Sequence, residues 1–143
     1  MRVVIQKSLE SSVIIDKQMV GKIDKGFVLL VGVTHEDTQA DAEYCARKIA
    51  KMRLFEDEND KMNLSLAEVE GQILSISQFT LFANTKKGNR PSYPNRTSAN
   101  RLIGAVLMDL HRFEVETGKF GAMMQVSILN DGPVTVLIDS KNP

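Results

Sequence analysis

The chain has 143 residues, the size of one ordinary domain, and 43% of them are hydrophobic, which is enough to bury a core. Its 18 basic and 18 acidic residues balance to a net charge of zero, so no overall positive field points to nucleic-acid binding. The sequence contains no run of about 20 apolar residues that could span a membrane, and its first residues are too few and too polar for a secretory leader.

These features predict a single domain over residues 1–143 with no membrane partner. The single cysteine, Cys45, cannot form an internal disulfide, and nothing indicates an oxidising compartment, so we expect a cytoplasmic protein. Because so short a chain buries a smaller fraction of its surface than a large enzyme does, a dimer would be unsurprising.

The first third of the chain predicts strands. A strand begins almost at once, and residues 12–16 and 19–23 are typical of a hairpin, although Lys17-Gln18 is a weak turn. Residues 26–33 form a continuous apolar run rich in β-branched side chains, which indicates a strand covered on both faces.

A helix follows these strands. Thr38 and Asp41 have the spacing of a capping box. The apolar residues after them share one helical face: Ala42, Cys45, Ala46, Ile49 and Met52. Cys45 is therefore expected to be a small core residue rather than a nucleophile. The acidic residues at 56–60 lack the spacing of an ion-binding loop and predict a solvated turn.

The second half of the chain predicts more strands and one more helix. Residues 71–83 are a candidate for one long strand, and residues 124–130 and 134–139 for two strands separated by Asp131-Gly132-Pro133. A helix is expected from Thr97 or Ser98, with an apolar stripe formed by Leu102, Val106, Leu110 and Phe113. Together these elements predict an α+β fold with two main helices and a mixed or largely antiparallel sheet.

A polar loop at residues 83–96 lies in a stretch, residues 71–108, that contains no Asp or Glu. The basic residues of this stretch are Lys86, Lys87, Arg90, Arg96 and Arg101. Such a patch could contact a phosphate backbone, or it could be an ordinary solvated loop. Charge alone leaves both interpretations open.

The usual catalytic sets are missing from the sequence. Two histidines, His35 and His111, and one cysteine make no credible zinc site, and no triad partner lies near either histidine. No phosphate-binding glycine loop occurs. Any chemistry must therefore depend on backbone groups and hydroxyls, and no metal or cofactor is expected.

Two segments break local rules. Ser77-Gln78-Phe79-Thr80 places polar groups at the end of an apolar strand, where they either cap the backbone or serve a function. Asn130-Asp131-Gly132-Pro133-Val134-Thr135 joins the most permissive residue to the stiffest one and is typical of a tight turn. Neither segment identifies the protein by itself.

Together, in this order, the two segments resemble the signature motifs of the D-aminoacyl-tRNA deacylase family. The resemblance covers nearly the whole chain and includes residues 55–58, 61–65, 87–88, 90–92 and 118–122. The sequence departs from the family pattern at three places. Asp60 stands where the family usually has glycine, Met123 where it often has aspartate, and Tyr93 replaces a common phenylalanine.

This resemblance implies a barrel-like deacylase fold and a homodimer without a metal or other cofactor. It implies hydrolysis of the ester between a D-amino acid, or glycine, and the terminal ribose of tRNA. The active site would form around Ser77, Gln78, Phe79 and Thr80. Gly132 and Pro133, joined by a cis peptide bond, would come from the partner subunit and select chirality by excluding L side chains.

Several roles stay open at this stage. The backbone N–H groups of Phe79 and Thr80 are candidates for an oxyanion hole. Thr80 could act as a nucleophile, or the ribose 2′-hydroxyl of the substrate could assist instead. The resemblance makes Lys86, Lys87, Arg90 and Arg96 reasonable tRNA phosphate contacts. Alternatives are a deacylase that removes L-alanine or mainly glycine, a non-catalytic RNA-binding domain, and a plain structural domain.

Overall fold

The computed structural model describes residues 1–94 and 112–143. Its main sheet has the strand order β2-β1-β3-β6-β7, with β8 paired to β1. These strands are β1 (Arg2–Ile15), β2 (Gln18–Ile23), β3 (Gly26–Gly32), β6 (Gln72–Ser77), β7 (Val115–Thr117) and β8 (Gln125–Asp139). A two-stranded sheet is formed by β4 (Phe55–Glu56) and β5 (Met62–Leu64), and the helical elements are α1 (Gln39–Lys51) and the 3-10 turn η1 (Phe79–Phe82).

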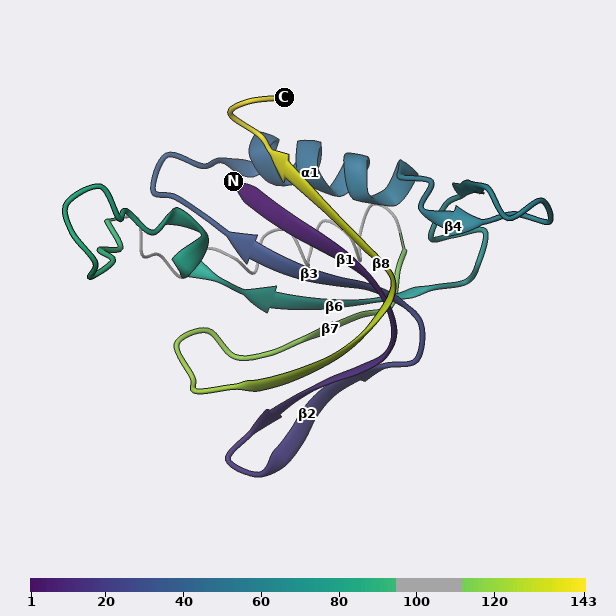
Figure 1. Cartoon of the computed structure of the whole chain (residues 1–143), viewed down its shortest axis with the longest axis horizontal. Coiled ribbons are helices and arrows are strands. Elements are labelled where there is room, and N and C mark those ends of the chain that lie inside the picture. The colour runs from purple at the N-terminus through teal and green to yellow at the C-terminus, as the bar shows by residue number, and fades with distance from the viewer. Residues whose placement is uncertain (95–111) are drawn as a thin grey trace.

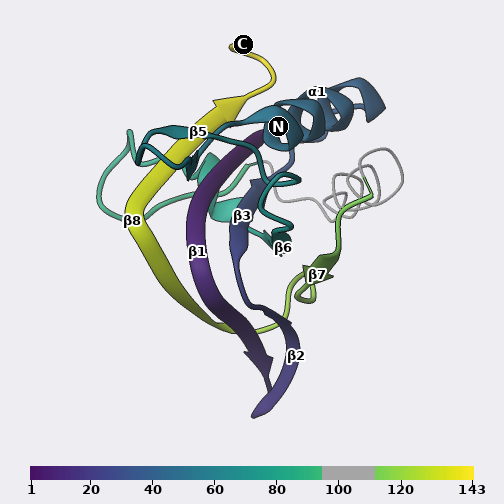
Figure 2. The same cartoon turned by 90° about the vertical axis from the view of Figure 1, so that its right-hand side faces the viewer.

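The main sheet is strongly curved and barrel-like, with α1 lying across the end where both termini meet (Figures 1 and 2). It is a mixed sheet, because β1 is antiparallel to β2, β3 and β8, whereas β6 is parallel to β3 and β7. The expected α+β class is therefore confirmed. No helix in residues 1–94 and 112–143 is long and apolar enough to cross a membrane.

The helix expected from Thr97 or Ser98 lies outside the described residues. Phe113, expected as its last apolar residue, lies in a non-helical segment and packs against the main core.

The β1–β2 hairpin is confirmed, but its turn lies one residue earlier than expected. Ile15 pairs with Gln18, so the turn residues are Asp16 and Lys17, with φ angles of 49° and 64°. Two consecutive positive φ angles are the geometry of a two-residue type I′ turn. The turn looked weak in the sequence because it contains no glycine.

The core lies between the curved sheet and α1. Strand β3 is central, with β1 on one side and β6 on the other, and nearly all of its residues are buried. Ala42, Cys45, Ala46 and Ile49 of α1 are 0% exposed and pack in the same cluster as residues of β1 and β3. The expected apolar face of the helix is therefore confirmed.

The start of α1 is fixed by Asp41. Its carboxylate accepts a hydrogen bond from the Thr38 backbone N–H at 2.8 Å and lies 3.1 Å from the Lys141 ammonium. Burial alone would raise the pKa of this carboxyl. The hydrogen bonds from Thr38, Ser140 and Lys141 outweigh burial, so the pKa of Asp41 lies well below its ordinary value.

We expect Asp41→Asn to lower the free energy of unfolding at neutral pH by about 1 kcal/mol, a typical loss for a helix cap. A lowered folded-state pKa gives stability that is present above the unfolded-state pKa of 3.8 and is lost as the pH falls through the folded-state value. The stability difference between wild type and variant should therefore narrow below about pH 4.

Urea unfolding from neutral pH to about pH 3 measures this difference. Asp16→Asn is the matched control, because Asp16 is exposed in the hairpin turn. A difference that stays constant over the whole pH range would contradict the role given to the Asp41 carboxylate.

Two strand predictions were wrong at functionally important places. The strand expected over residues 71–83 ends at Ser77, and the chain turns into η1 after Gln78, whose N–H donates to the Val31 carbonyl at 2.8 Å. The strands expected at 124–130 and 134–139 are one continuous strand, β8.

The segment expected to be a tight turn is a bulge within β8. Thr135 pairs with Gln6 and Asn130 pairs with Ser8, so the four residues 131–134 lie opposite the single residue Lys7. The bulge contains Gly132, with a φ of 128°, and the cis peptide bond to Pro133. We call residues 131–134 the Gly-Pro bulge.

Candidate functional site

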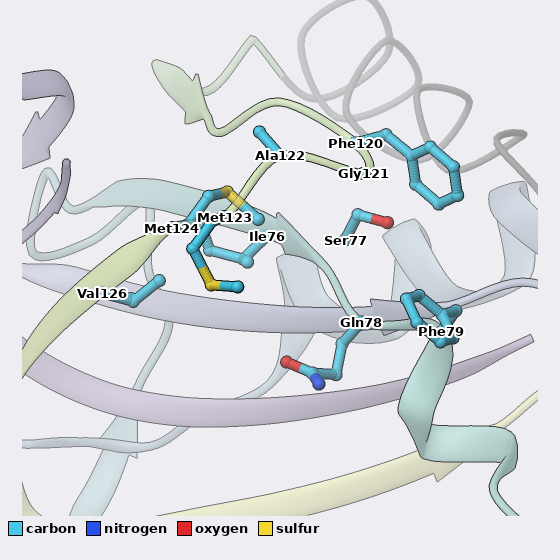
Figure 3. Close-up of a pocket in the computed structure, with 10 residues that line it drawn as sticks. All are labelled: Ile76, Ser77, Gln78, Phe79, Phe120, Gly121, Ala122, Met123, Met124 and Val126. Carbon is cyan, nitrogen blue, oxygen red and sulfur yellow. The ribbon is translucent and has the colours of Figure 1, made fainter. Parts of the chain in front are cut away.

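A cavity of about 370 Å³ lies at the end of β6 and is lined by ten residues (Figure 3). Ser77, Gln78 and Phe79 form one wall, and the segment between β7 and β8, with Phe120 and Met123, forms another. None of these ten described residues carries a charge. The groups that they offer to a substrate are hydroxyl, amide and backbone groups.

The position of Ser77 follows from the sheet. Ser77 pairs with Val31 as the last residue of the parallel β3–β6 ladder, so its place is fixed relative to the buried core. Figure 3 shows the Ser77 hydroxyl on the side of Phe120 and Gly121, with the Gln78 amide directed the other way. The hydroxyl thus stands at the carboxyl end of a strand, in a half-buried position.

Thr80 is held by Gln78. The Gln78 amide nitrogen donates a hydrogen bond to the Thr80 hydroxyl, which lies in η1. Among the described residues, Thr80 does not line the cavity, whereas Ser77, Gln78 and Phe79 do. The Phe79 ring meets the Tyr93 ring edge-on, with centroids 5.2 Å apart, so the tyrosine supplies the aromatic contact at this place.

Gly132 and Pro133 are not among the described residues that line the cavity. The start of β8 reaches the cavity through Val126, and Pro133 follows seven residues later on the same strand, roughly 20 Å further along it. Within the described residues, the chain therefore does not bring its own Gly-Pro bulge to its own cavity, and both Gly132 and Pro133 are exposed.

A buried lysine lies opposite the bulge, and the sequence analysis missed it. The Lys7 side chain is 1% exposed, and its ammonium lies 2.7 Å from both Glu56 carboxylate oxygens and 3.7 Å from the Asp131 carboxylate. Its signal in the sequence is its position, because Val3, Ile5 and Lys7 alternate on the buried face of β1. Lys7 thus ties the first residue of the bulge to the molecule.

The pKa of Glu56 is lowered by the hydrogen bond from Lys7, so this carboxylate stays ionised as the partner of the buried ammonium. The acidic residues at 56–60 otherwise form a mostly exposed turn, as expected. Within residues 1–94 and 112–143, no group of His, Cys, Asp or Glu could hold a metal ion.

The basic residues predicted to contact phosphate lie on a closed loop. Asn84 and Ser92 exchange two backbone hydrogen bonds, at 2.8 and 3.0 Å, and close the loop between them. Lys86, Lys87 and Arg90 are exposed there, and none of them forms an ion pair within the described parts of the chain. Arg96 lies outside the described residues.

Cys45 and His35 do not line the cavity. Cys45 is buried, and burial raises the pKa of its thiol to about 11, so it stays a protonated core residue. His35 is exposed in a loop, and His111 lies outside the described residues. Asp60 stands where the deacylase family usually has glycine. Its φ is positive, at 58°, and glycine adopts such angles without a steric penalty, which explains the family preference.

Comparison with known proteins gives consistent matches. A family model described as D-Tyr-tRNA(Tyr) deacylase matches residues 4–139. A D-aminoacyl-tRNA deacylase of Bacillus cytotoxicus is 54% identical over 146 aligned positions, which cover 99% of this chain and 100% of the relative. One from Bacillus cereus is 53% identical with the same coverage.

Two solved structures are also similar. One, titled c-Myc DNA unwinding element binding protein, has a TM-score of 0.85 and 36% identity and covers 97% of this chain and 98% of its own. Another, described as a probable eukaryotic D-amino acid tRNA deacylase, has a TM-score of 0.73 and 15% identity, with 96% and 97% covered. At that identity, the second likeness shows the fold alone.

Proposed function

Because the chain belongs to the D-Tyr-tRNA(Tyr) deacylase family, we propose that the cavity beside Ser77 is where it hydrolyses D-aminoacyl-tRNA. The protein is a D-aminoacyl-tRNA deacylase, an ester hydrolase that acts on aminoacyl-tRNA. Water attacks the ester between the amino acid and the terminal ribose and releases free D-amino acid and tRNA. The observation that carries the assignment to this cavity is its uncharged wall of Ser77, Gln78 and Phe79.

The proposed catalysis uses orientation and an oxyanion hole. An aminoacyl ester is already activated, so holding water in line and stabilising the developing negative charge is enough. The N–H groups of Phe79 and Thr80 are the proposed donors, because they belong to the first turn of η1, where the backbone favours negative charge. No metal or organic cofactor takes part in this mechanism.

The ribose 2′-hydroxyl of the substrate is the proposed helper, in place of a nucleophilic Thr80. The Thr80 hydroxyl accepts a hydrogen bond from Gln78, and within the described residues no carboxylate or imidazole contacts it as a base. A threonine without a base is a weak nucleophile. The substrate hydroxyl adjoins the ester and needs no protein base to reach it.

We propose a homodimer in which Gly132 and Pro133 of the partner subunit complete each cavity. The bulge is exposed and far from the Ser77 of its own chain, so it can meet such a cavity only on another copy. In the described residues, β8 pairs only with β1, and Leu129 and Leu137 on β8 are 56% and 62% exposed. An exposed strand edge with large apolar side chains suits a subunit interface.

The bulge selects chirality by exclusion. A stiff backbone wall on one side of the substrate α-carbon leaves no space for an L side chain, whereas a D side chain points towards solvent. Glycine has no side chain to exclude and would also be hydrolysed. Residue 132 favours glycine, because its φ is 128° and a Cβ there would lie 2.8 Å from the Val134 side chain.

The tRNA body contacts the basic loop in this proposal. Lys86, Lys87, Arg90 and Arg96 are the phosphate contacts, and aminoacylated tRNA as substrate makes the cytoplasm the proposed place of action.

Release of D-tyrosine from D-Tyr-tRNA should be fast with wild type and unaffected by a chelator, and L-Tyr-tRNA and L-Ala-tRNA should not be hydrolysed.

Thr80→Ala should lower kcat by about tenfold or less, because only the positioning contribution of the Thr80 hydroxyl is lost. A nucleophile would lose about 10⁴-fold or more. Thr117→Ala is the control, since Thr117 is exposed on β7. A chelator-sensitive reaction, or preferred hydrolysis of L-Ala-tRNA, would contradict the proposal.

Gly132→Ala should reduce the ratio of D-Tyr-tRNA to L-Tyr-tRNA hydrolysis by at least about tenfold, since one methyl group displaces the bulge. Gly88→Ala is the control: Gly88 also has a positive φ, of 98°, but a Cβ there meets nothing within 4 Å. Circular dichroism verifies that both variants fold. If wild type and Gly132→Ala show the same ratio of D-Tyr-tRNA to L-Tyr-tRNA hydrolysis, the bulge does not select chirality.

Glutamine at positions 86, 87, 90 and 96 should reduce the salt dependence of tRNA binding. The slope of log Kd against log salt should fall by roughly three, about 0.7 to 0.9 for each of the four lost phosphate contacts. A Lys17→Gln/Lys61→Gln protein controls for net charge, since both lysines are exposed elsewhere. An unchanged slope in the fourfold variant would remove the basic loop from the tRNA interface.

A further inference from the structure

A second cavity, of about 330 Å³, lies beside η1 and is distinct from the cavity at Ser77. It is lined by Arg2 from β1, by Phe82 from the end of η1, and by Asn84, Thr85 and Lys86 from the start of the basic loop. The two cavities share no lining residue among the described parts of the chain. The function proposed above uses Lys86 as a phosphate contact and gives Arg2 and Phe82 no role.

Arg2 and Phe82 form a platform in this cavity. The Arg2 guanidinium lies over the Phe82 ring, 4.7 Å from its centroid. Its Nε lies 3.0 Å from the Asp139 carboxylate, and its Nη1 donates to the Leu81 carbonyl at 3.2 Å. These two acceptors hold the guanidinium beside the ring, and an aromatic ring paired with a guanidinium is a surface on which a nucleobase can stack.

The Phe82 ring packs closely against Gly32 at the end of β3. A Cβ at Gly32 would lie 3.0 Å from the Phe82 ring and 3.1 Å from the Leu81 side chain. The ring therefore packs directly on the backbone of a central strand. This close approach fixes the platform to the same ladder that positions Ser77.

The charge at this cavity suits a phosphate. Arg2 is compensated by Asp139, whereas Lys86 forms no ion pair with any described residue. The Lys86 backbone N–H donates to the Asn84 side chain at 2.9 Å, which fixes the start of the loop from which the ammonium extends. The platform can bind the base of one nucleotide, and the uncompensated Lys86 ammonium beside it can bind the phosphate of the same nucleotide.

The two cavities are joined by a single turn of η1. Phe79 lines the first and Phe82 the second, and three residues of 3-10 helix advance about 6 Å. Figure 1 shows η1 between the end of β6 and the loop that contains Lys86. A single strand whose last nucleoside lies in the first cavity reaches the second with the nucleotide before it.

We propose that Arg2, Phe82 and Lys86 form a subsite for the nucleotide that precedes the terminal adenosine of the tRNA, with its base on the platform and its phosphate at Lys86. This subsite rests on the proposed function of the Ser77 cavity. It gives the enzyme an affinity for single-stranded 3′ ends that does not depend on the amino acid.

Binding of an uncharged cytidylyl-cytidylyl-adenosine trinucleotide tests the subsite, with adenosine as the reference ligand. Competition against a fluorescein-labelled trinucleotide, followed by anisotropy, gives both affinities. Phe82→Leu should lower the ratio of trinucleotide to adenosine affinity about tenfold, the loss of one base stack. Lys86→Ala should lower the salt slope of trinucleotide binding by about 0.7.

Lys61→Ala is the control, since Lys61 is exposed between β4 and β5, and its ratio should equal that of wild type. Lys86 is exposed, so Lys86→Ala decides the matter if Phe82→Leu does not fold. An unchanged ratio in Phe82→Leu with an unchanged slope in Lys86→Ala would overturn the subsite. D-Tyr-tRNA hydrolysis by wild type is measured in parallel. If wild type does not hydrolyse D-Tyr-tRNA, the proposed function of the Ser77 cavity is wrong. The binding measurements test the subsite independently of that result.

Discussion

The backbone ladder of β1 is the constraint on which the rest of the molecule depends. Val3 pairs with Val31 of β3 on one side and with Ile138 of β8 on the other, so one strand sets the register of both neighbours. A slip of one residue would turn Val3 and Ile5, which are 0% exposed, out of the core and cost several kcal/mol of burial. Because Ser77 pairs with Val31, the same register also fixes the hydroxyl of the proposed active site.

The Gly-Pro bulge interrupts the pairing of β1 with β8. Four residues of β8 lie opposite Lys7 alone, and a buried ammonium of this kind is tolerable only when it is paired. Glu56 and Asp131 supply the pairing from two different elements, and both acids remain partly exposed, at 48% and 38%. The ion pair with Lys7 therefore holds the bulge to the sheet, while Gly132 and Pro133 are exposed, which suits the proposed wall for a partner subunit.

Local patterns were enough to predict some elements and not others. The Thr38–Asp41 spacing and the apolar face containing Cys45 predicted α1, because both signals lie within the helix itself. Leu81 and Phe82 extend the apolar run beyond Ser77, so the pattern could not reveal that the strand ends there. Gly132-Pro133 has the composition of a turn, and only its pairing with distant β1 makes it a bulge. The two site motifs came from a family resemblance, whereas the cavity and the second platform follow from pairing that spacing does not encode.

The charged side chains discussed above serve the structure or the proposed binding of tRNA. None of the described residues that line the cavity of the proposed reaction is charged. Lys7 and Arg2 are each paired with carboxylates, whereas Lys86, Lys87 and Arg90 on the basic loop form no ion pair within the described residues. No described residue that lines the cavity offers a carboxylate or imidazole as a general base, so in the proposed mechanism the proton moves through water or the substrate hydroxyl. A tRNA ester supplies that hydroxyl, the activated bond and the polyanion together. In the proposed mechanism, the enzyme has only to hold the 3′ end rigidly between η1 and the bulge of a partner subunit and to stabilise the oxyanion with backbone groups.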